Sequence, residues 1–228
     1  NNPTGATIDG TIAVTLDNSQ SFTVDNDGTI AGSDTTAAFG ISALNITTIT
    51  NLTNDGIISG TAGNTIGRGI ALSTSTITNL TNNDTISGIA TTGNSGEGIS
   101  FFNSSTITNL TNTGTISGTA AATRGIGIVL SSDSRITNLT NDGTISGTAT
   151  TGSNGLGILL FDSDITTLTN TGNISGSATG GNTGAGILVQ EAGSALTTLT
   201  NHGTISGTAG TNGAGGVIVD RGGVITTL

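Results

Sequence analysis

The sequence has no Cys, Met, Trp or Tyr, a single Pro, and only four basic residues, all of them Arg. Without Cys it forms no disulfide, which suits the cytosol as well as a secreted protein without cross-links. Five Phe are the only aromatic residues, so the large side chains that usually fill the space between packed layers are scarce. An ordinary globular core is therefore not expected.

The charge balance and the hydropathy pattern exclude further classes. Acidic residues outnumber basic ones by 14 to 4, and the net charge of −10 repels phosphate backbones and anionic membranes. No apolar run approaches the roughly 18 residues of a membrane helix, and no basic and then apolar leader precedes Asn1. We expect no nucleic-acid partner and no membrane insertion by this chain; any secretion signal would have been removed or would lie outside it.

The dominant feature is a phrase of the form Ile-Thr-Asn-Leu-Thr-Asn-x-Gly-Thr-Ile-Ser-Gly-Thr-Ala, which returns every 28 to 31 residues. Abundant Gly, Ser, Thr and Asn also occur in disordered segments, but a chain that never packs has no reason to return Ile and Leu to the same phase. A fixed period with small insertions is typical of a solenoid. We predict one β-solenoid domain over residues 1–228, with an incomplete first coil at 1–23 and regular repeats at 24–228. The central apolar residues of the phrase are Val24, Leu52, Leu80, Leu110, Leu139, Leu168, Leu199 and Leu228.

Each repeat contains three apolar stretches rich in β-branched Ile and Thr, separated by Gly or small polar residues. The predicted fold class is all-β: a single-stranded, right-handed parallel β-helix with three short strands per coil, about 29 residues per coil and seven to eight coils. In the first stretch, such as Ile77 to Leu80, the apolar residues are three positions apart. Strict strand alternation does not give this spacing, so we expect a bend between them.

The second stretch, such as Thr115 to Ala120, alternates with a period of two. Its Ile, Gly and Ala should face inward, and the missing Cβ of the Gly should leave room for bulk from the opposite wall. The inward Ile residues are Ile30, Ile58, Ile86, Ile116, Ile145, Ile174 and Ile205.

The third stretch follows a Gly-x-Gly pair, as in Gly127-Ile128-Val129-Leu130, and its outward residues become more apolar toward the C-terminus. A contiguous exposed apolar surface usually marks a contact. These residues are therefore candidate contacts with a lateral partner, such as another copy of the chain. The outward residues are Ala71, Ser100, Val129, Leu159, Leu188 and Ile218.

An Asn recurs two residues after each central apolar residue. Asn at a turn tolerates the left-handed region and bonds nearby backbone, so a stacked ladder of side-chain amides is expected, with a structural role rather than a ligand-binding one. The ladder residues are Asn26, Asn54, Asn82, Asn112, Asn141, Asn170 and Asn201.

Residues suited to chemistry are sparse. The densest charged patch should consist of Asp133 and Arg135 and, one coil on, Asp162 and Asp164. A solvated turn explains this cluster better than a catalytic site does. His202 has no second His and no Cys with which to form a metal or nucleophile set. We expect no catalytic residues, no enzymatic activity and no cofactor; weak Ca²⁺ binding by isolated Asp residues stays open.

The two ends of the chain match one another. Asn2 would fall two places after Leu228 if one copy followed another, which is where a ladder Asn belongs. Ile8 and Leu228 are thus candidate contacts for end-to-end stacking of copies, because uncapped strand edges polymerise. Truncation of a longer repeat array at Leu228 is the alternative.

The phrase at Ile136 to Gly147 resembles repeats in the passenger regions of bacterial autotransporters and related large surface adhesins, and the resemblance covers about Val24 to Leu228. It implies a secreted rod on a bacterial cell surface that acts in adhesion, aggregation or biofilm, with an unspecified host or cell-surface ligand. We expect a non-enzymatic structural protein, either a subunit of a surface fibre or the stalk of an adhesin.

Two alternatives stay open. Rows of outward Thr on the second stretch, such as Thr115, Thr144 and Thr204, resemble the ice-binding face of β-solenoid antifreeze proteins, although Thr also suits any soluble β face. A glycan-binding or glycan-cleaving β-helix is the other, and the scarcity of aromatic residues argues against it.

Overall fold

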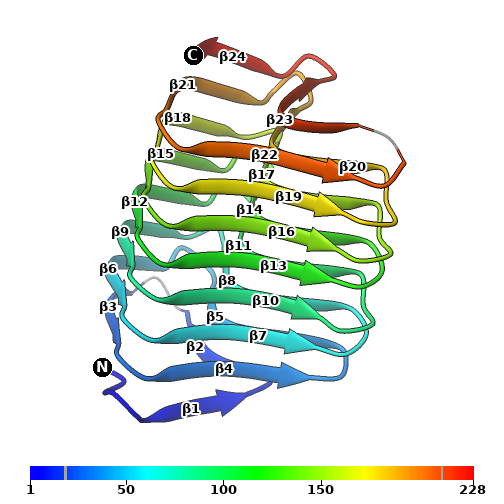
Figure 1. Ribbon diagram of the computed structural model, residues 1–228. Helices are drawn as coiled ribbons and strands as arrows, with labels where there is room; N and C mark the ends of the chain where they lie inside the picture. The colour runs from blue at the N-terminus through cyan, green and yellow to red at the C-terminus, as the bar shows by residue number, and fades with distance from the viewer. Residues whose placement is uncertain (18–19, 212) are drawn as a thin grey trace.

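The computed structural model describes residues 1–17, 20–211 and 213–228, and there the chain consists of strands and turns. It is an all-β solenoid of about seven turns, with roughly 29 residues and three strands in each turn (Figure 1). No helix in the described ranges is long and apolar enough to cross a membrane. The strands of successive turns stack into three parallel sheets, so the predicted fold class is confirmed.

The three sheets are named here by the place of their strands in the coil. Sheet 1 contains β3 (Ser21–Asn26), β6 (Thr48–Asn54), β9 (Thr76–Asn82), β12 (Thr106–Asn112), β15 (Arg135–Asn141), β18 (Asp164–Asn170), β21 (Ala195–Asn201) and β24 (Val224–Thr227). Sheet 2 contains β1 (Thr7–Gly10), β4 (Thr29–Asp34), β7 (Ile57–Ala62), β10 (Thr85–Ala90), β13 (Thr115–Ala120), β16 (Thr144–Ala149), β19 (Asn173–Ala178) and β22 (Thr204–Ala209). Sheet 3 contains β2 (Ile12–Leu16), β5 (Ala37–Ala43), β8 (Ile66–Ser73), β11 (Ser95–Phe102), β14 (Arg124–Ser131), β17 (Asn154–Phe161), β20 (Thr183–Gln190) and β23 (Ala214–Asp220).

The coil is right-handed. In Figure 1 the strands of sheet 2 face the viewer and run from left to right, while the chain climbs from its blue N-terminus to its red C-terminus. Strand spacing in a sheet is about 4.8 Å, so eight stacked strands make a rod roughly 35–40 Å long.

The core is a set of vertical files of identical side chains. Leu80 pairs with Leu110, which pairs with Leu139, and all three are buried. Ile30 to Ile174 of the second strands form a parallel file that is also buried. Ile205, at the C-terminal end of the described stack, is only partly buried. Each file excludes water by stacking small apolar groups one coil apart.

The first strand bends where its spacing predicts. Ile77 and Asn79 pair with residues of β12, but Thr78 between them does not. Ile77 and Leu80 are both buried although they are three residues apart. The chain therefore turns a corner within the strand, and both apolar side chains reach the core.

The inward Gly of the second strand has a different role from the one expected. A Cβ placed on Gly118 would clash with the backbone oxygens of Ile126 and Gly96 in sheet 3. The same conflict with sheet 3 backbone recurs along this file in the interior coils. The missing Cβ thus accommodates close approach of two backbones and not bulk from an opposite side chain.

Sheet 3 has a corner of its own, which overturns the expected exposed apolar surface. Pairing skips Gly98 and Gly127, and Ile126 packs on the same outer side as Val129, three residues on. With the strand bent there, the outer face is concave, and its side chains pack on one another. Val129, Leu159 and Leu188 are only 5%, 5% and 7% exposed. Ile218, in the last coil, is partly buried against them.

Candidate functional site

The Asn ladder joins the described coils from one end to the other. Each Asn donates its Nδ2 to the Oδ1 of the next Asn at 2.7–2.8 Å, beginning with Asn2. The amide of Asn141 also donates to the backbone oxygens of Gly143 and Asn173, both at 3.3 Å. From Asn2 to Asn170 these side chains are buried, so the ladder satisfies polar groups that have no access to water.

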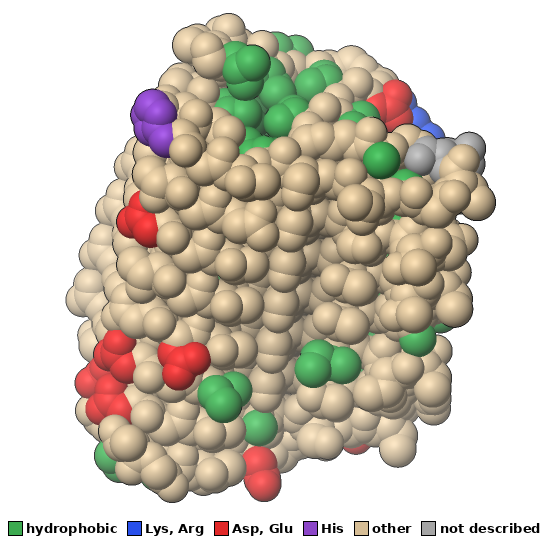
Figure 2. Space-filling view, in the orientation of Figure 1, with side chains coloured by type: hydrophobic (Ala, Val, Ile, Leu, Met, Phe, Trp, Pro, Cys, Tyr) green, Lys and Arg blue, Asp and Glu red, His purple; other side chains and the backbone are tan. Residues whose placement is uncertain are grey.

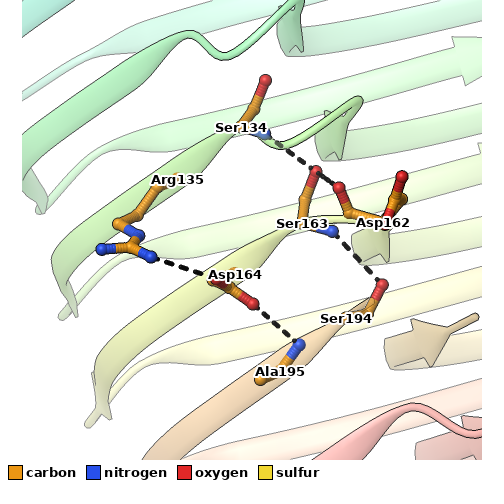
Figure 3. A network of polar contacts seen from close by, with 7 residues as sticks. All are labelled: Ser134, Arg135, Asp162, Ser163, Asp164, Ser194 and Ala195. Atoms are coloured by element: carbon orange, nitrogen blue, oxygen red, sulfur yellow. Dashed lines mark hydrogen bonds and ion pairs between the residues drawn. The ribbon is translucent and has the colours of Figure 1, made fainter. Parts of the chain in front are cut away.

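Of the four charged residues predicted to gather around Arg135, Arg135 and Asp164 form an ion pair at the start of β15 and β18, and Ser and backbone hydrogen bonds lie beside the pair (Figure 3). Arg135 donates to Asp164 at 3.3 Å, and Asp164 accepts the backbone N–H of Ala195 at 3.1 Å. Beside them the Oγ of Ser163 accepts the backbone N–H of Ser134 at 3.2 Å. The Arg135 side chain is 55% exposed, so this ion pair is a solvated surface contact of small energetic weight.

A second charged pair is largely buried, and it was not predicted from the sequence. Arg68 and Glu97 occupy neighbouring places in one outer file of sheet 3, and their side chains meet at 2.7 Å. The side chain of Arg68 also lies over the rings of Phe39 and Phe102, at 5.5 and 4.6 Å from their centroids. Their spacing of 29 residues, one period, was the only signal in the sequence that they stack.

Glu97 is held ionised although it is 2% exposed. Burial alone would raise its pKa. The positive charge of Arg68, together with hydrogen bonds from Arg68, Ser95 and Ser100, outweighs burial, so the pKa of Glu97 lies below its usual value. Its oxygens accept from Ser95 Oγ at 2.7 Å and Ser100 Oγ at 2.8 Å. Glu97 is therefore a structural carboxylate with its acceptor sites in use.

The concave outer face of sheet 3, called the trough below, changes character along the rod. Near the N-terminus it holds Phe39, Arg68 and Glu97. Further on its floor is aliphatic, formed by Ile126, Val129, Leu156, Leu159, Ala185 and Leu188. A pocket of about 230 Å³ lies where the two parts meet, with Phe102 and Phe161 among its lining side chains. The residues predicted as lateral contacts thus form the floor of this trough.

Three carboxylates come together where the chain passes from sheet 1 to sheet 2, one at the end of β3 and two in the turns that follow β3 and β6. Ligand oxygens of Asp25, Asp27 and Asp55 lie within 4.8 Å of one another. Asp25 accepts from Asn1 at 2.8 Å and Asp55 from Asn83 at 2.7 Å. Carboxylates at this spacing are the ligand type that Ca²⁺ prefers, but exposed acidic groups with amide partners are also ordinary surface features.

The outer face of sheet 2 is flat and nearly free of charge (Figure 2). Thr85, Thr115 and Thr144 are direct partners in neighbouring strands. Ser residues form the next file along the strands, so hydroxyl groups repeat with the strand spacing over most of the face. Ile57, Ile89 and Asn173 interrupt the files.

The terminal coils are open. At the N-terminal end Ile8 is 37% exposed and borders a depression of about 180 Å³ that reaches Val14, Val24 and Ile30. At the C-terminal end Leu228 is 88% exposed.

In comparisons with known proteins, no family model, curated protein or solved structure matches the chain.

Proposed function

We propose that this chain is a non-enzymatic structural rod of an extracellular bacterial surface protein, and that further copies continue its β-helix end to end. The observation that carries the proposal is the uniform register of the coils, because the three sheets and the Asn ladder continue unbroken from coil to coil. Core side chains and ladder groups of residues 1–228 are uncovered at both ends of the stack, where a further coil in the same register would cover them. The location outside the cell rests on the resemblance of the repeat phrase to surface adhesins.

The polar part of the match concerns the Asn ladder. At the C-terminal end, Nδ2 of Asn201 donates within the described residues only to the oxygen of Gly203, at 3.2 Å. Interior ladder amides also donate to the next Asn, as Asn141 does to Asn170 at 2.7 Å. At the N-terminal end, Oδ1 of Asn2 accepts no hydrogen bond from the part of the chain that the structure describes. Head-to-tail stacking would bring the Oδ1 of Asn2 to the Asn201 amide, which would then donate to it as interior ladder amides donate to the next Asn.

The apolar part of the match concerns Leu228. Thr227 pairs with Thr198, so Leu228 continues the file of Leu199. In a following copy the next member of that file is Val24, which borders the N-terminal depression. Stacking would bury Leu228 there and cover the apolar side chains that gather at the C-terminal end of the rod in Figure 2.

The test is sedimentation velocity and negative-stain electron microscopy of residues 1–228 over a range of concentrations. We expect rods whose length grows with concentration in steps of about 40 Å, one molecule long. Ile8→Arg should cap the rods, because it places a charge in the joint. Ile57→Arg is the matched control: Ile57 is 41% exposed on the lateral face, against 37% for Ile8 at the end. Single rods at every concentration, or equal effects of the two variants, would refute stacking of copies.

A second candidate function is ice binding, favoured by the files of hydroxyl groups on the flat, uncharged face of sheet 2. An ice-binding face needs a regular array that ordered water can match. Thermal hysteresis measurements test this directly. Thr115→Lys and Thr144→Lys should abolish hysteresis, whereas Thr76→Lys on sheet 1 should not; a freezing point equal to the melting point in the unaltered chain would exclude ice binding.

A further inference from the structure

The pocket in the trough is lined in part by polar side chains that have no hydrogen-bond partner among the described residues. Among the described residues, the guanidinium of Arg124 and the amides of Asn154 and Gln190 have no hydrogen-bond or ion-pair partner. All three line the pocket. Arg124 and Asn154 are direct partners in β14 and β17, so they lie side by side on one wall.

The rest of the pocket is apolar. Its floor is built from Val129, Leu156, Leu159 and Leu188, which are fixed by packing in a continuous cluster. Phe102 and Phe161 are the aromatic side chains in the lining, and Phe161 is 42% exposed. An apolar floor with a few convergent polar groups at the rim is the usual composition of a small-molecule site.

The charge of the pocket is defined by Arg124. The other two ionised side chains in the lining, Arg68 and Glu97, neutralise one another at 2.7 Å. One positive charge is therefore left at the rim, in a chain whose net charge is −10. An anion that reaches the pocket meets one planar fork of donors from Arg124 and further amide donors from Asn154 and Gln190.

We propose that this pocket binds a small organic anion, a carboxylate attached to a compact apolar body such as a single ring. The carboxylate lies against Arg124 and Asn154, and the ring lies on the Leu156 and Leu159 floor beside Phe161. At about 230 Å³ the pocket is smaller than the roughly 300–1,000 Å³ of sites for drug-sized molecules, so the body is limited to about one ring. The inference is independent of end-to-end stacking, because the trough lies on the side of the rod.

The test uses phenylacetate and its neutral isostere phenylacetamide as probes, added into the millimolar range to ¹⁵N-labelled chain and followed by NMR. Saturable shifts are expected for backbone amides of Arg124, Asn154 and Leu159. Loss of a charge-assisted hydrogen bond makes phenylacetamide bind about tenfold more weakly. Arg124→Gln should weaken phenylacetate by a similar factor.

Arg135→Gln is the matched control, because it removes the same charge from a solvated turn outside the trough. It should leave the affinity for phenylacetate within about twofold of the unaltered chain, since exposed distant charges are screened by salt. Ser131→Trp, which places bulk in the lining, should abolish binding of both probes while the backbone spectrum stays folded. Absence of saturable shifts, equal affinity for the two probes, or equal losses in Arg124→Gln and Arg135→Gln would overturn the proposal.

Discussion

At the scale of single residues, a buried Asn of the ladder should contribute more to the stability of the fold than the outward polar residues of the same strand. Asn141 is fully buried, donates to three oxygens and accepts one amide N–H. Removing its side chain leaves the buried Oδ1 of Asn170 without its donor, while the amide of Asn112 loses one acceptor and keeps the backbone oxygens of Gly114 and Thr144. An unpaired buried polar group costs its full desolvation free energy, which exceeds the small net gain of an ordinary hydrogen bond.

Asn141→Ala should therefore lower the free energy of unfolding by about 2–4 kcal/mol, the sum expected for the unpaired Oδ1 of Asn170 and the other hydrogen bonds that Asn141 makes. Urea denaturation followed by circular dichroism measures the change. Asn138→Ala is the control from the same strand. Asn138 also belongs to an Asn file, bonding Asn109 at 2.9 Å, but it is exposed, so we expect a loss below about 0.5 kcal/mol. Similar losses in the two variants would show that burial does not govern the ladder.

The ion pair in the trough predicts a pH dependence. The pKa of Glu97 is lowered in the folded chain, so the stabilisation from its charge is present above the unfolded pKa, near 4.3, and is lost as pH falls through the folded value. Glu97→Gln should cost about 3 kcal/mol at pH 7, because Arg68 is left without its counter-charge. Below pH 4 the two chains should converge in stability.

Urea melts between pH 3 and pH 7 would measure this convergence. Glu191→Gln is the control: it breaks the pair with Arg221, whose side chain is 62% exposed, and should leave the stability nearly unchanged because solvent screens exposed pairs. A constant difference between Glu97→Gln and the unaltered chain across the acid range would rule out linkage through this carboxylate.

At the scale of the element, the inward Gly of each interior second strand lies so close to the backbone of sheet 3 that a Cβ would not fit between them. Gly118→Ala should destabilise the chain by about 3 kcal/mol or more, since the new Cβ would overlap backbone oxygens that cannot move without breaking the sheet. Gly10 belongs to the same file in the first coil, where a Cβ would meet nothing nearer than 3.4 Å. Gly10→Ala should be close to neutral in thermal denaturation, and a comparable loss there would contradict the packing argument.

How far the sequence predicts these elements depends on whether a feature repeats. The files of Leu110 and Asn112 and the bend after Ile107 follow from residues that return in every coil. The corner at Gly127 does not, because the sequence shows Gly-x-Gly without the angle between its flanking residues. Without that angle, Val129 and Leu159 were expected on an exposed surface. For the same reason the ion pair between Arg68 and Glu97 could not be predicted.

At the scale of the whole molecule, each coil contacts its neighbours and little else, so stability is close to a sum over coils. Arg135 is the sheet partner of Thr106, and Ile136 is that of Ile107. Deleting residues 107–135 therefore joins Thr106 directly to Ile136. Ile136 then takes the place of Ile107, its sheet partner, so the junction keeps the register of the coil. The shortened chain should fold with one coil fewer, keep a β-sheet circular dichroism spectrum and unfold cooperatively.

The urea m-value of the shortened chain should fall by roughly one eighth, in proportion to the surface exposed on unfolding. Deletion of residues 107–120 is the matched control, because half a coil brings first-strand residues into the place of a third strand and every following file loses its partners. That chain should be unfolded or aggregated. Equal folding of both deletions would mean that vertical alignment of identical side chains is not what specifies this rod.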